Sequence, residues 1–245
     1  MTMARVKDTA GFCLPELMIA MAAGAVVLAA SVQTLDHFDH RFRGQQRAMA
    51  SQQDLRIGLG VVQSELRIAH SGSPLQTGVL RLSETEVEFM ANLNESVTTF
   101  REAVSGEATE LPVRNGGDWP RGKTIHVCTL TRCAEGRLAR DGRVQSLTVS
   151  APLGQAFPAG SLVSLSNRVR YYLRRDPAGT FTLMRMVDGG ASALFGEVVG
   201  FRVVGFDRSG HPTQGPTAVA RLHLEVMMRG QAIPVTTDIG LRSNS

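Results

Sequence analysis

A hydrophobic stretch from Phe12 to Val32 constrains the fold of this chain more than any other feature. As an α-helix rising ~1.5 Å per residue, its 21 residues would extend ~31 Å, close to the ~30 Å hydrocarbon core of a bilayer. One acidic residue, Glu16, lies near its start. Because an isolated carboxylate in a membrane span is costly, it implies a partner or a function. The stretch therefore predicts a membrane helix whose acid needs an explanation.

The composition is that of a folded protein with one membrane segment. Of the 245 residues, 43% are hydrophobic and 20% are charged, and the formal net charge is +4. The apolar stretch is confined to one end, which excludes a polytopic membrane protein. The charge is spread along the chain and aromatic residues make up only 5%, so we expect no nucleic-acid site. Phosphate-binding glycine loops, Gly-x-Ser-x-Gly elbows and His-Glu-x-x-His motifs are missing, so neither an enzyme nor a cofactor is expected.

Two of the three cysteines, Cys128 and Cys133, are near enough in sequence to close a small disulfide ring. An N-terminal apolar segment would place the rest of the chain outside the cytoplasm, where disulfides persist. A zinc site that also uses His126 is the alternative, but a fourth ligand at suitable spacing is missing. The third cysteine, Cys13, is expected to face lipid or a neighbouring helix. The disulfide is the favoured prediction, and no metal is expected.

Two simple explanations of the apolar stretch leave part of it unexplained. A secretory signal peptide also has a basic start, here Arg5 and Lys7, and could be cleaved after Ala30. Its apolar core is usually only ~7–15 residues long, and Glu16 would lie where that core begins. A plain signal anchor explains the length of the stretch, but neither Glu16 nor the junction at 11–12.

The segment Gly-Phe-Cys-Leu-Pro-Glu-Leu-Met-Ile-Ala, residues 11–20, resembles the N-terminal motif of type IV pilins and of the pseudopilins of type II secretion. The resemblance implies that prepilin peptidase cleaves after Gly11 and methylates the new N-terminal residue, Phe12. Glu16 is then the fifth residue of the mature chain, as it is in the family. Pro15 departs from the usual branched aliphatic residue. Proline is tolerated in a first helical turn, because the N–H that it lacks would be unpaired there anyway.

The resemblance also implies a role for the acid. In this family an assembly platform in the inner membrane moves the cleaved helix into a filament, where Glu16 would pair with the Phe12 amine of a neighbouring subunit. Because an unpaired buried charge is strongly unfavourable, this pair would favour the correct stagger of subunits. The expected partners are prepilin peptidase, other minor and major pilins, and the platform. A glutamate that merely reaches the lipid headgroups is the alternative.

Beyond the membrane segment the sequence keeps a helical period. Apolar residues recur at spacings of three and four: Leu55, Leu59, Val62, Leu66 and Ala69. We predict one helix from Leu14 to His70, with glycines that weaken it locally at 44, 58 and 60. The predicted parts are a leader at 1–11, a membrane half at 12–35 and an amphipathic half at 36–73. Residues 36–40, Asp-His-Phe-Asp-His, are expected to form a solvated polar collar, with a metal site as the less favoured alternative.

From residue 74 to 245 the pattern changes to short strands separated by turn residues, which predicts a β-rich head. The alternation of Val87, Phe89 and Ala91 predicts a half-buried strand, and three acids there are expected to be solvated: Glu84, Glu86 and Glu88. Residues 94–121 are expected to be a loop. Further strands are predicted at 123–130, 145–150, 162–165, 169–174, 181–187, 198–207, 219–228 and 233–241. The expected fold class is α+β, with a long N-terminal helix packed on a mostly antiparallel sheet.

The head weakly resembles PilW-like minor pilins and J-type minor pseudopilins. The shared features are a Val-Arg-Tyr-Tyr-Leu strand at 169–173 and an apolar segment at 194–204. The resemblance implies a minor subunit that helps to initiate filament assembly, anchored in the inner membrane with a periplasmic head. A J-type pseudopilin in the tip complex of a type II secretion system is the alternative within this class. A membrane-anchored periplasmic enzyme or binding protein is the alternative from another class.

Overall fold

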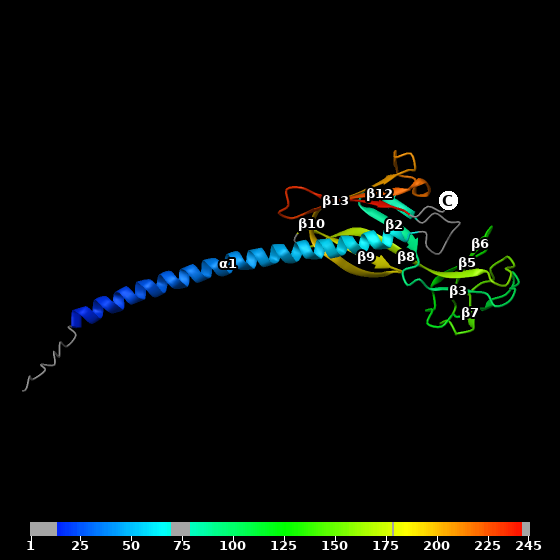
Figure 1. The fold of residues 1–245 in the computed structure, drawn as a ribbon, viewed down its shortest axis with the longest axis horizontal. Helices are drawn as coiled ribbons and strands as arrows, with labels where there is room; N and C mark the ends of the chain where they lie inside the picture. The colour runs from blue at the N-terminus through cyan, green and yellow to red at the C-terminus, as the bar shows by residue number, and fades with distance from the viewer. Residues whose placement is uncertain (1–13, 70–78, 178, 242–245) are drawn as a thin grey trace, which may run out of the picture. The chain divides into compact units, whose positions relative to one another are not determined.

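The computed structural model describes residues 14–69, 79–177 and 179–241. The chain forms two compact units, residues 1–52 and residues 53–245. A long N-terminal helix, α1, and a largely antiparallel curled β-sheet give an α+β fold (Figure 1), which confirms the fold class predicted from the sequence.

Helix α1 runs from Leu14 to Arg67. Its last part, within the second unit, packs on the sheet through a buried face that matches the predicted one: Leu55, Leu59, Val62 and Leu66. Ala69 follows the helix, is fully buried and pairs with Ala91, so it continues this face. The predicted helix end at His70 lies outside the described residues. Residues 36–50 are all exposed, so the predicted amphipathic half contributes to packing only near its C-terminal end.

The main sheet follows the order β1-β2-β8-β9-β10-β12-β13, and neighbouring strands along it are antiparallel. These strands are β1 (Val79–Ser83), β2 (Glu86–Ala91), β8 (Leu162–Arg175), β9 (Phe181–Val187), β10 (Gly190–Phe206), β12 (Arg221–Met228) and β13 (Val235–Gly240). Strands β3 (Val97–Thr99) and β5 (Thr124–Cys128) flank the first half of β8, and β6 (Cys133–Arg137) pairs with β5. Strand β11 (Pro212–Thr213) pairs with β10. A separate pair joins β4 (Glu110–Pro112) to β7 (Ser146–Thr148), and a 3₁₀ turn, η1, covers Pro216–Ala218.

Strand β8 is longer than the sequence indicates. The two strands predicted at 162–165 and 169–174 are one, because the residues between them keep cross-strand partners: Ser166 with Thr124, Asn167 with Ala91 and Arg168 with Met90. Strands β8 and β9 pair as an antiparallel hairpin. In its turn the Gly179 N–H donates to the Asp176 carbonyl oxygen at 3.1 Å.

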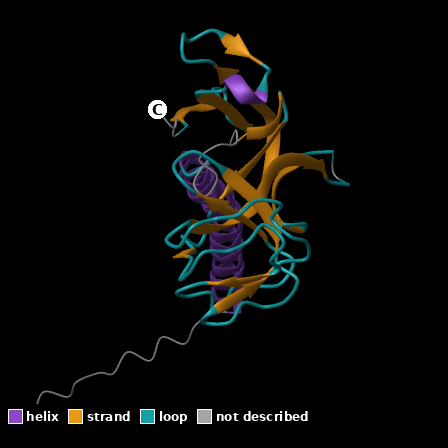
Figure 2. Cartoon of the chain, turned by 90° about the vertical axis from the view of Figure 1, so that its right-hand side faces the viewer, coloured by secondary structure: helices purple, strands orange, loops and turns teal. Residues whose placement is uncertain are grey.

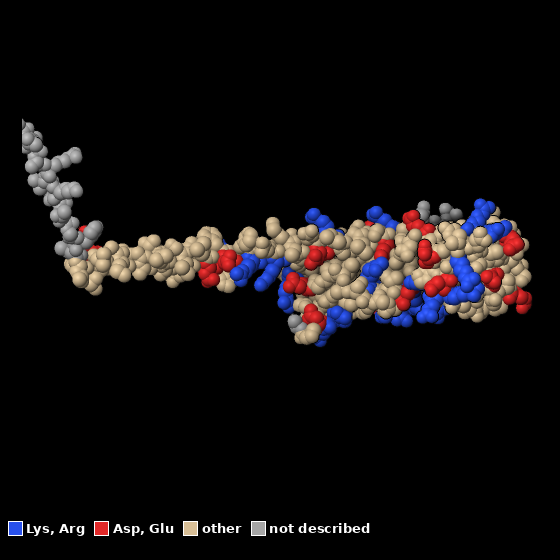
Figure 3. Space-filling model, turned by 90° about the horizontal axis from the view of Figure 1, so that it is seen from below, with Lys and Arg blue, Asp and Glu red and all other residues tan. Residues whose placement is uncertain are grey.

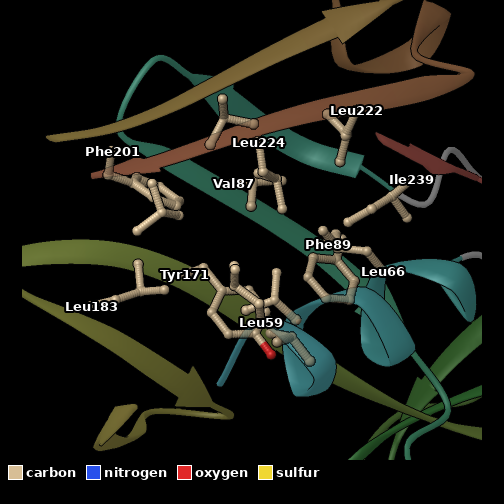
Figure 4. Packing of buried hydrophobic residues seen from close by; sticks show 14 of the residues in the cluster. Leu59, Leu66, Val87, Phe89, Tyr171, Leu183, Phe201, Leu222, Leu224 and Ile239 are labelled. Atoms are coloured by element: carbon tan, nitrogen blue, oxygen red, sulfur yellow. The ribbon is translucent and has the colours of Figure 1, made fainter. Parts of the chain in front are cut away.

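A hydrophobic core lies between α1 and the side of the main sheet that faces it. Figure 4 shows Leu59 and Leu66 of the helix beside Phe89 and Tyr171 of the sheet. The rings of Phe89 and Tyr171 stack with their centroids 6.1 Å apart, and both side chains are fully buried. Burying such large apolar surfaces fixes the C-terminal end of α1 against the sheet.

A second core lies farther along the chain, in a part made of short strands and long loops (Figure 2). Phe100, Leu111 and Val113 are fully buried in it, although all three belong to the stretch that the sequence predicts to be a loop. That prediction is wrong, because β3, β4 and these core residues fall within 94–121. Strand β6 was also not predicted. Strands of three to five residues leave too few alternations for a period to be recognised.

The prediction that the acids around β2 are solvated is wrong for two of the three. Glu88 is buried and Glu86 is half-buried. Strand β8 runs beside β2 and supplies an arginine for each: Arg168 Nε donates to Glu88, and Arg170 donates to Glu86 at 2.8 Å. A carboxylate with a charged donor tolerates removal from water. Only Glu84, in the turn between β1 and β2, is exposed.

Candidate functional site

Glu16 lies in the first turn of α1, in a helical segment that is otherwise uncharged up to Leu35. Every residue from Leu14 to Leu35 is exposed. Figure 3 shows this uncharged surface, which ends where acidic and basic side chains first gather on the helix. Among the described residues, α1 is the helix that is long and apolar enough to cross a membrane. The helix therefore has the length and composition of a membrane anchor.

The predicted cleavage and methylation sites, Gly11 and Phe12, lie outside the described residues. Of the three residues singled out in the N-terminal motif, the structure thus places only Glu16.

Two hydroxyl groups within the apolar segment bond to the helix itself. Ser31 Oγ donates to the Val27 carbonyl oxygen at 2.8 Å, and Thr34 Oγ1 donates to the Ala30 carbonyl oxygen at 2.7 Å. A hydroxyl that bonds to the preceding turn has a partner without water. Neither hydroxyl therefore opposes transfer of this segment into an apolar environment.

The run at 36–40 forms ion pairs along one side of the helix. Arg43 donates to Asp39 at 2.9 Å, and His40 lies 3.7 Å from Asp36. All four side chains are more than 60% exposed, so each pair is weakened by water. The arrangement is that of a solvated collar directly after the apolar segment.

The C-terminal end of α1 is held to the sheet by a buried charge cluster that sequence reasoning missed. Arg185 of β9 donates through Nε and Nη2 to both carboxylate oxygens of Glu65. The hydroxyl of Tyr171, on the neighbouring strand β8, donates to the same carboxylate at 2.5 Å. Glu65 lies next to Leu66 in the sequence, and nothing in the helical pattern shows that a strand more than 100 residues later provides its partner.

Burial and charge raise the pKa values of both donors in this cluster. The pKa of the Tyr171 hydroxyl is raised, first because it is desolvated and then because it bonds to the Glu65 carboxylate. The bond to Glu65 also raises the pKa of Arg185 above its ordinary value. The tyrosine therefore stays protonated and the arginine stays charged, so both keep donating to Glu65 at any physiological pH.

The structure joins Cys128 and Cys133 in a disulfide at the end of the β5–β6 hairpin. Both sulfurs are thus bonded to each other, which leaves no thiolate for the alternative zinc site. His126, on β5, is buried, and burial lowers the pKa of its imidazole although Glu135 on β6 opposes the shift. Across residues 14–69, 79–177 and 179–241, no group of three or more His, Cys, Asp or Glu side chains is placed to hold a metal ion.

A hollow of about 480 Å³ lies beside the disulfide. It is formed by the hairpin end and by the segment that leads into β8, including Leu130, Pro158 and Leu162. None of the residues around it carries an ionisable group that could transfer a proton.

A scan against protein-family models found no match for this chain, and a search of curated proteins found none either.

Proposed function

We propose that this protein is a minor subunit of a type IV pilus or a related filament, and that its function is assembly rather than catalysis. The observation that carries the proposal is the position of Glu16. It is the one charge in an exposed apolar helical segment, five residues after Gly11. A carboxylate at that place has no use in a simple anchor, whereas it has a partner in a bundle of helices that each begin with an amine.

The proposed sequence of events follows from these parts. Prepilin peptidase removes residues 1–11 and methylates Phe12, and α1 then holds the chain in the inner membrane with its β-rich head in the periplasm. The assembly platform lifts the helix into the filament, where Glu16 pairs with the N-terminal amine of a neighbouring pilin. The head selects the neighbours. The Glu65–Arg185 pair supports this proposal, because it links α1 to the sheet. The head would therefore move together with the helix when the platform lifts it.

Mass spectrometry of the chain purified from cell membranes tests the proposal. We expect a mature chain that begins at Phe12 and carries one N-methyl group. A Gly11→Val variant is the control, because blocking cleavage at this bond should leave the chain starting at Met1. A wild-type chain that starts at Met1, or after Ala30, would overturn the proposal. Co-purification with pilus subunits or with secretion-system subunits then identifies the machine.

A further inference from the structure

The two ends of the main sheet differ in how their edges are protected. At the β1 end the pairing with β2 is interrupted by a register shift between Val79 and Arg81. The adjoining turn is also tied down, because the Glu84 carbonyl oxygen accepts the Val203 N–H at 2.8 Å. Bulges and contacts of this kind stop an edge strand from pairing with another chain. The β1 edge is therefore closed.

Among the described residues, the β13 edge shows neither a register shift nor such a contact. All its residues from Val235 to Gly240 pair with β12 without a register shift. The Leu241 N–H donates to the Ala220 carbonyl oxygen. This bond shows which residues of β13 direct their backbone groups toward β12. Because the direction of backbone groups alternates, residues 235, 237 and 239 bond to β12, whereas Thr236, Asp238 and Gly240 point their N–H and C=O groups outward. In the part of the chain that the structure describes, these outward groups have no hydrogen-bond partner.

The side chains around this edge have a definite polarity. Thr237 faces α1, where Gln63 Nε2 donates to its hydroxyl. Arg56 and Arg67 are seven positions before and four after Gln63, so they share its flank of the helix, and both are exposed. Asp238 faces the opposite side of the sheet with 57% of its side chain exposed, and its carboxylate lies 3.1 Å from His223 Nδ1 and 4.0 Å from Arg221 Nε, both on β12. An added strand would therefore meet positive charge on the side of α1 and, on the other side, a carboxylate that β12 already pairs.

We propose that β13 is the edge at which a neighbouring subunit of the filament adds an extended segment to the sheet. The inference rests on the proposed function, since the filament supplies the neighbour. The outward groups of Thr236, Asp238 and Gly240 provide the main-chain hydrogen bonds, as in other cases of strand addition. The added segment carries an acidic residue toward Arg56 and Arg67. Contact with this edge orders the head relative to its neighbour, which the pairing at Glu16 cannot do by itself.

Hydrogen exchange measured by mass spectrometry tests this inference on the wild-type chain. The chain purified in detergent is compared with the same chain in filaments sheared from cells. We expect the amides of Thr236, Asp238 and Gly240 to exchange at least about tenfold more slowly in filaments, because each gains a backbone hydrogen bond. The β12 amides are the internal control, since β12 has a strand on each side already and should not change.

A pair of variants at one position separates backbone from side chain. Asp238→Pro removes an outward N–H and leaves the bonds to β12, whereas Asp238→Ala keeps the N–H and removes only the carboxylate. We expect Asp238→Pro to reduce incorporation into filaments at least about tenfold more than Asp238→Ala. Thermal unfolding of both variants in detergent checks that the head remains folded.

The outcomes separate the inference from the proposal beneath it. If the wild-type chain is absent from filaments, the proposed function fails and the inference falls with it. If the chain is present but its β13 amides exchange as fast as in detergent, the inference alone is overturned. The same holds if a folded Asp238→Pro chain is incorporated as well as the wild type.

Discussion

Glu65 of α1 and Arg185 of β9 are 120 positions apart in the chain, yet they form a bidentate ion pair inside the head. The side chains are only 11% and 27% exposed, so water screens their attraction little. Replacing Glu65 alone by Leu leaves Arg185 without its partner in a poorly solvated place. We expect this change to lower the free energy of unfolding by about 3–5 kcal/mol, measured by urea denaturation in detergent.

The matched control replaces both members of the pair. A Glu65→Leu, Arg185→Met chain buries no unpaired charge, so its loss should be smaller than that of Glu65→Leu by at least about 2 kcal/mol. Equal losses in the single and double variants would contradict a paired buried charge.

Two glycines of α1, two positions apart, should respond to alanine in opposite ways. A Cβ atom on Gly58 would lie 2.3 Å from Phe195 Cδ1, whereas one on Gly60 would meet nothing within 4 Å. Phe195 is itself buried and cannot easily move. We expect Gly58→Ala to destabilise the head by about 1–3 kcal/mol through overpacking, and Gly60→Ala to stabilise it by about 0.5–1 kcal/mol through helix propensity. Chemical denaturation measures both, and effects of the same sign would show that the helix does not pack as described.

The buried imidazole of His126 should make the stability of the head depend on pH. Burial lowers its pKa below the ordinary value of 6.5, and its Nε2 has no hydrogen-bond partner among the described residues. The unfolded chain therefore binds a proton more readily than the folded chain as the pH falls below about 6.5. The stability that this residue contributes is complete above that pH and is lost on acidification.

We expect a His126→Phe chain to lose less free energy of unfolding between pH 7 and pH 5 than the wild type, a difference that parallel denaturation series at about these pH values would reveal. His211→Gln is the control, because His211 is 81% exposed and its replacement also removes one imidazole but disturbs no buried side chain. Identical pH profiles for His126→Phe and the wild type would rule out this role for His126.

The disulfide closes a ring between residues only five positions apart, so its contribution should be modest. The loop-entropy relation gives about 2 kcal/mol for a ring of this size. A Cys128→Ser, Cys133→Ser chain should therefore still fold. It should unfold at a lower urea concentration than the wild type. Addition of a reductant should destabilise the wild type by a similar amount and leave the double variant unchanged. A reductant that affects both chains equally would show that the two sulfurs are not joined.

Removal of the Glu16 carboxylate should impair assembly and spare the head. Glu16 is exposed and lies in the first compact unit, so Glu16→Ala should not change the thermal unfolding of residues 53–245. Incorporation into filaments should fall at least about tenfold, because the proposed charge pair is lost. Glu16→Gln, which keeps the shape and removes the charge, should behave in the same way. Normal incorporation of either variant would remove the role assigned to this acid.

The sequence predicted best those features that repeat within one element. The face from Leu55 to Leu66 is recognisable because a helix returns to the same side every three or four residues, and all four predicted positions are buried. The alternation of Val87, Phe89 and Ala91 likewise predicted the buried side of β2. Local periodicity reports burial directly, since the packed side of an element is the side kept out of water.

Features that depend on a partner far along the chain could not be predicted in this way. The sequence around Glu88 looks like a solvated acidic strand, and its burial depends on Arg168, 80 positions later. The burial of Glu65 could not be predicted for the same reason, because its partner Arg185 lies 120 positions later in the chain. The sequence alone indicates only that Gly58 weakens the helix. The reason for a glycine there is its close contact with Phe195, which requires α1 to pack against β10.

The second core is built from one continuous piece of chain, which leaves the main sheet after β2 and returns within β8, where Ala91 lies opposite Asn167. Two ends that meet on neighbouring strands make such a piece a self-contained insertion. It can be lengthened, shortened or exchanged in evolution while α1 and the Glu65–Arg185 pair stay as they are. Diversification of this head would then proceed by replacement of a module, with α1 inherited unchanged.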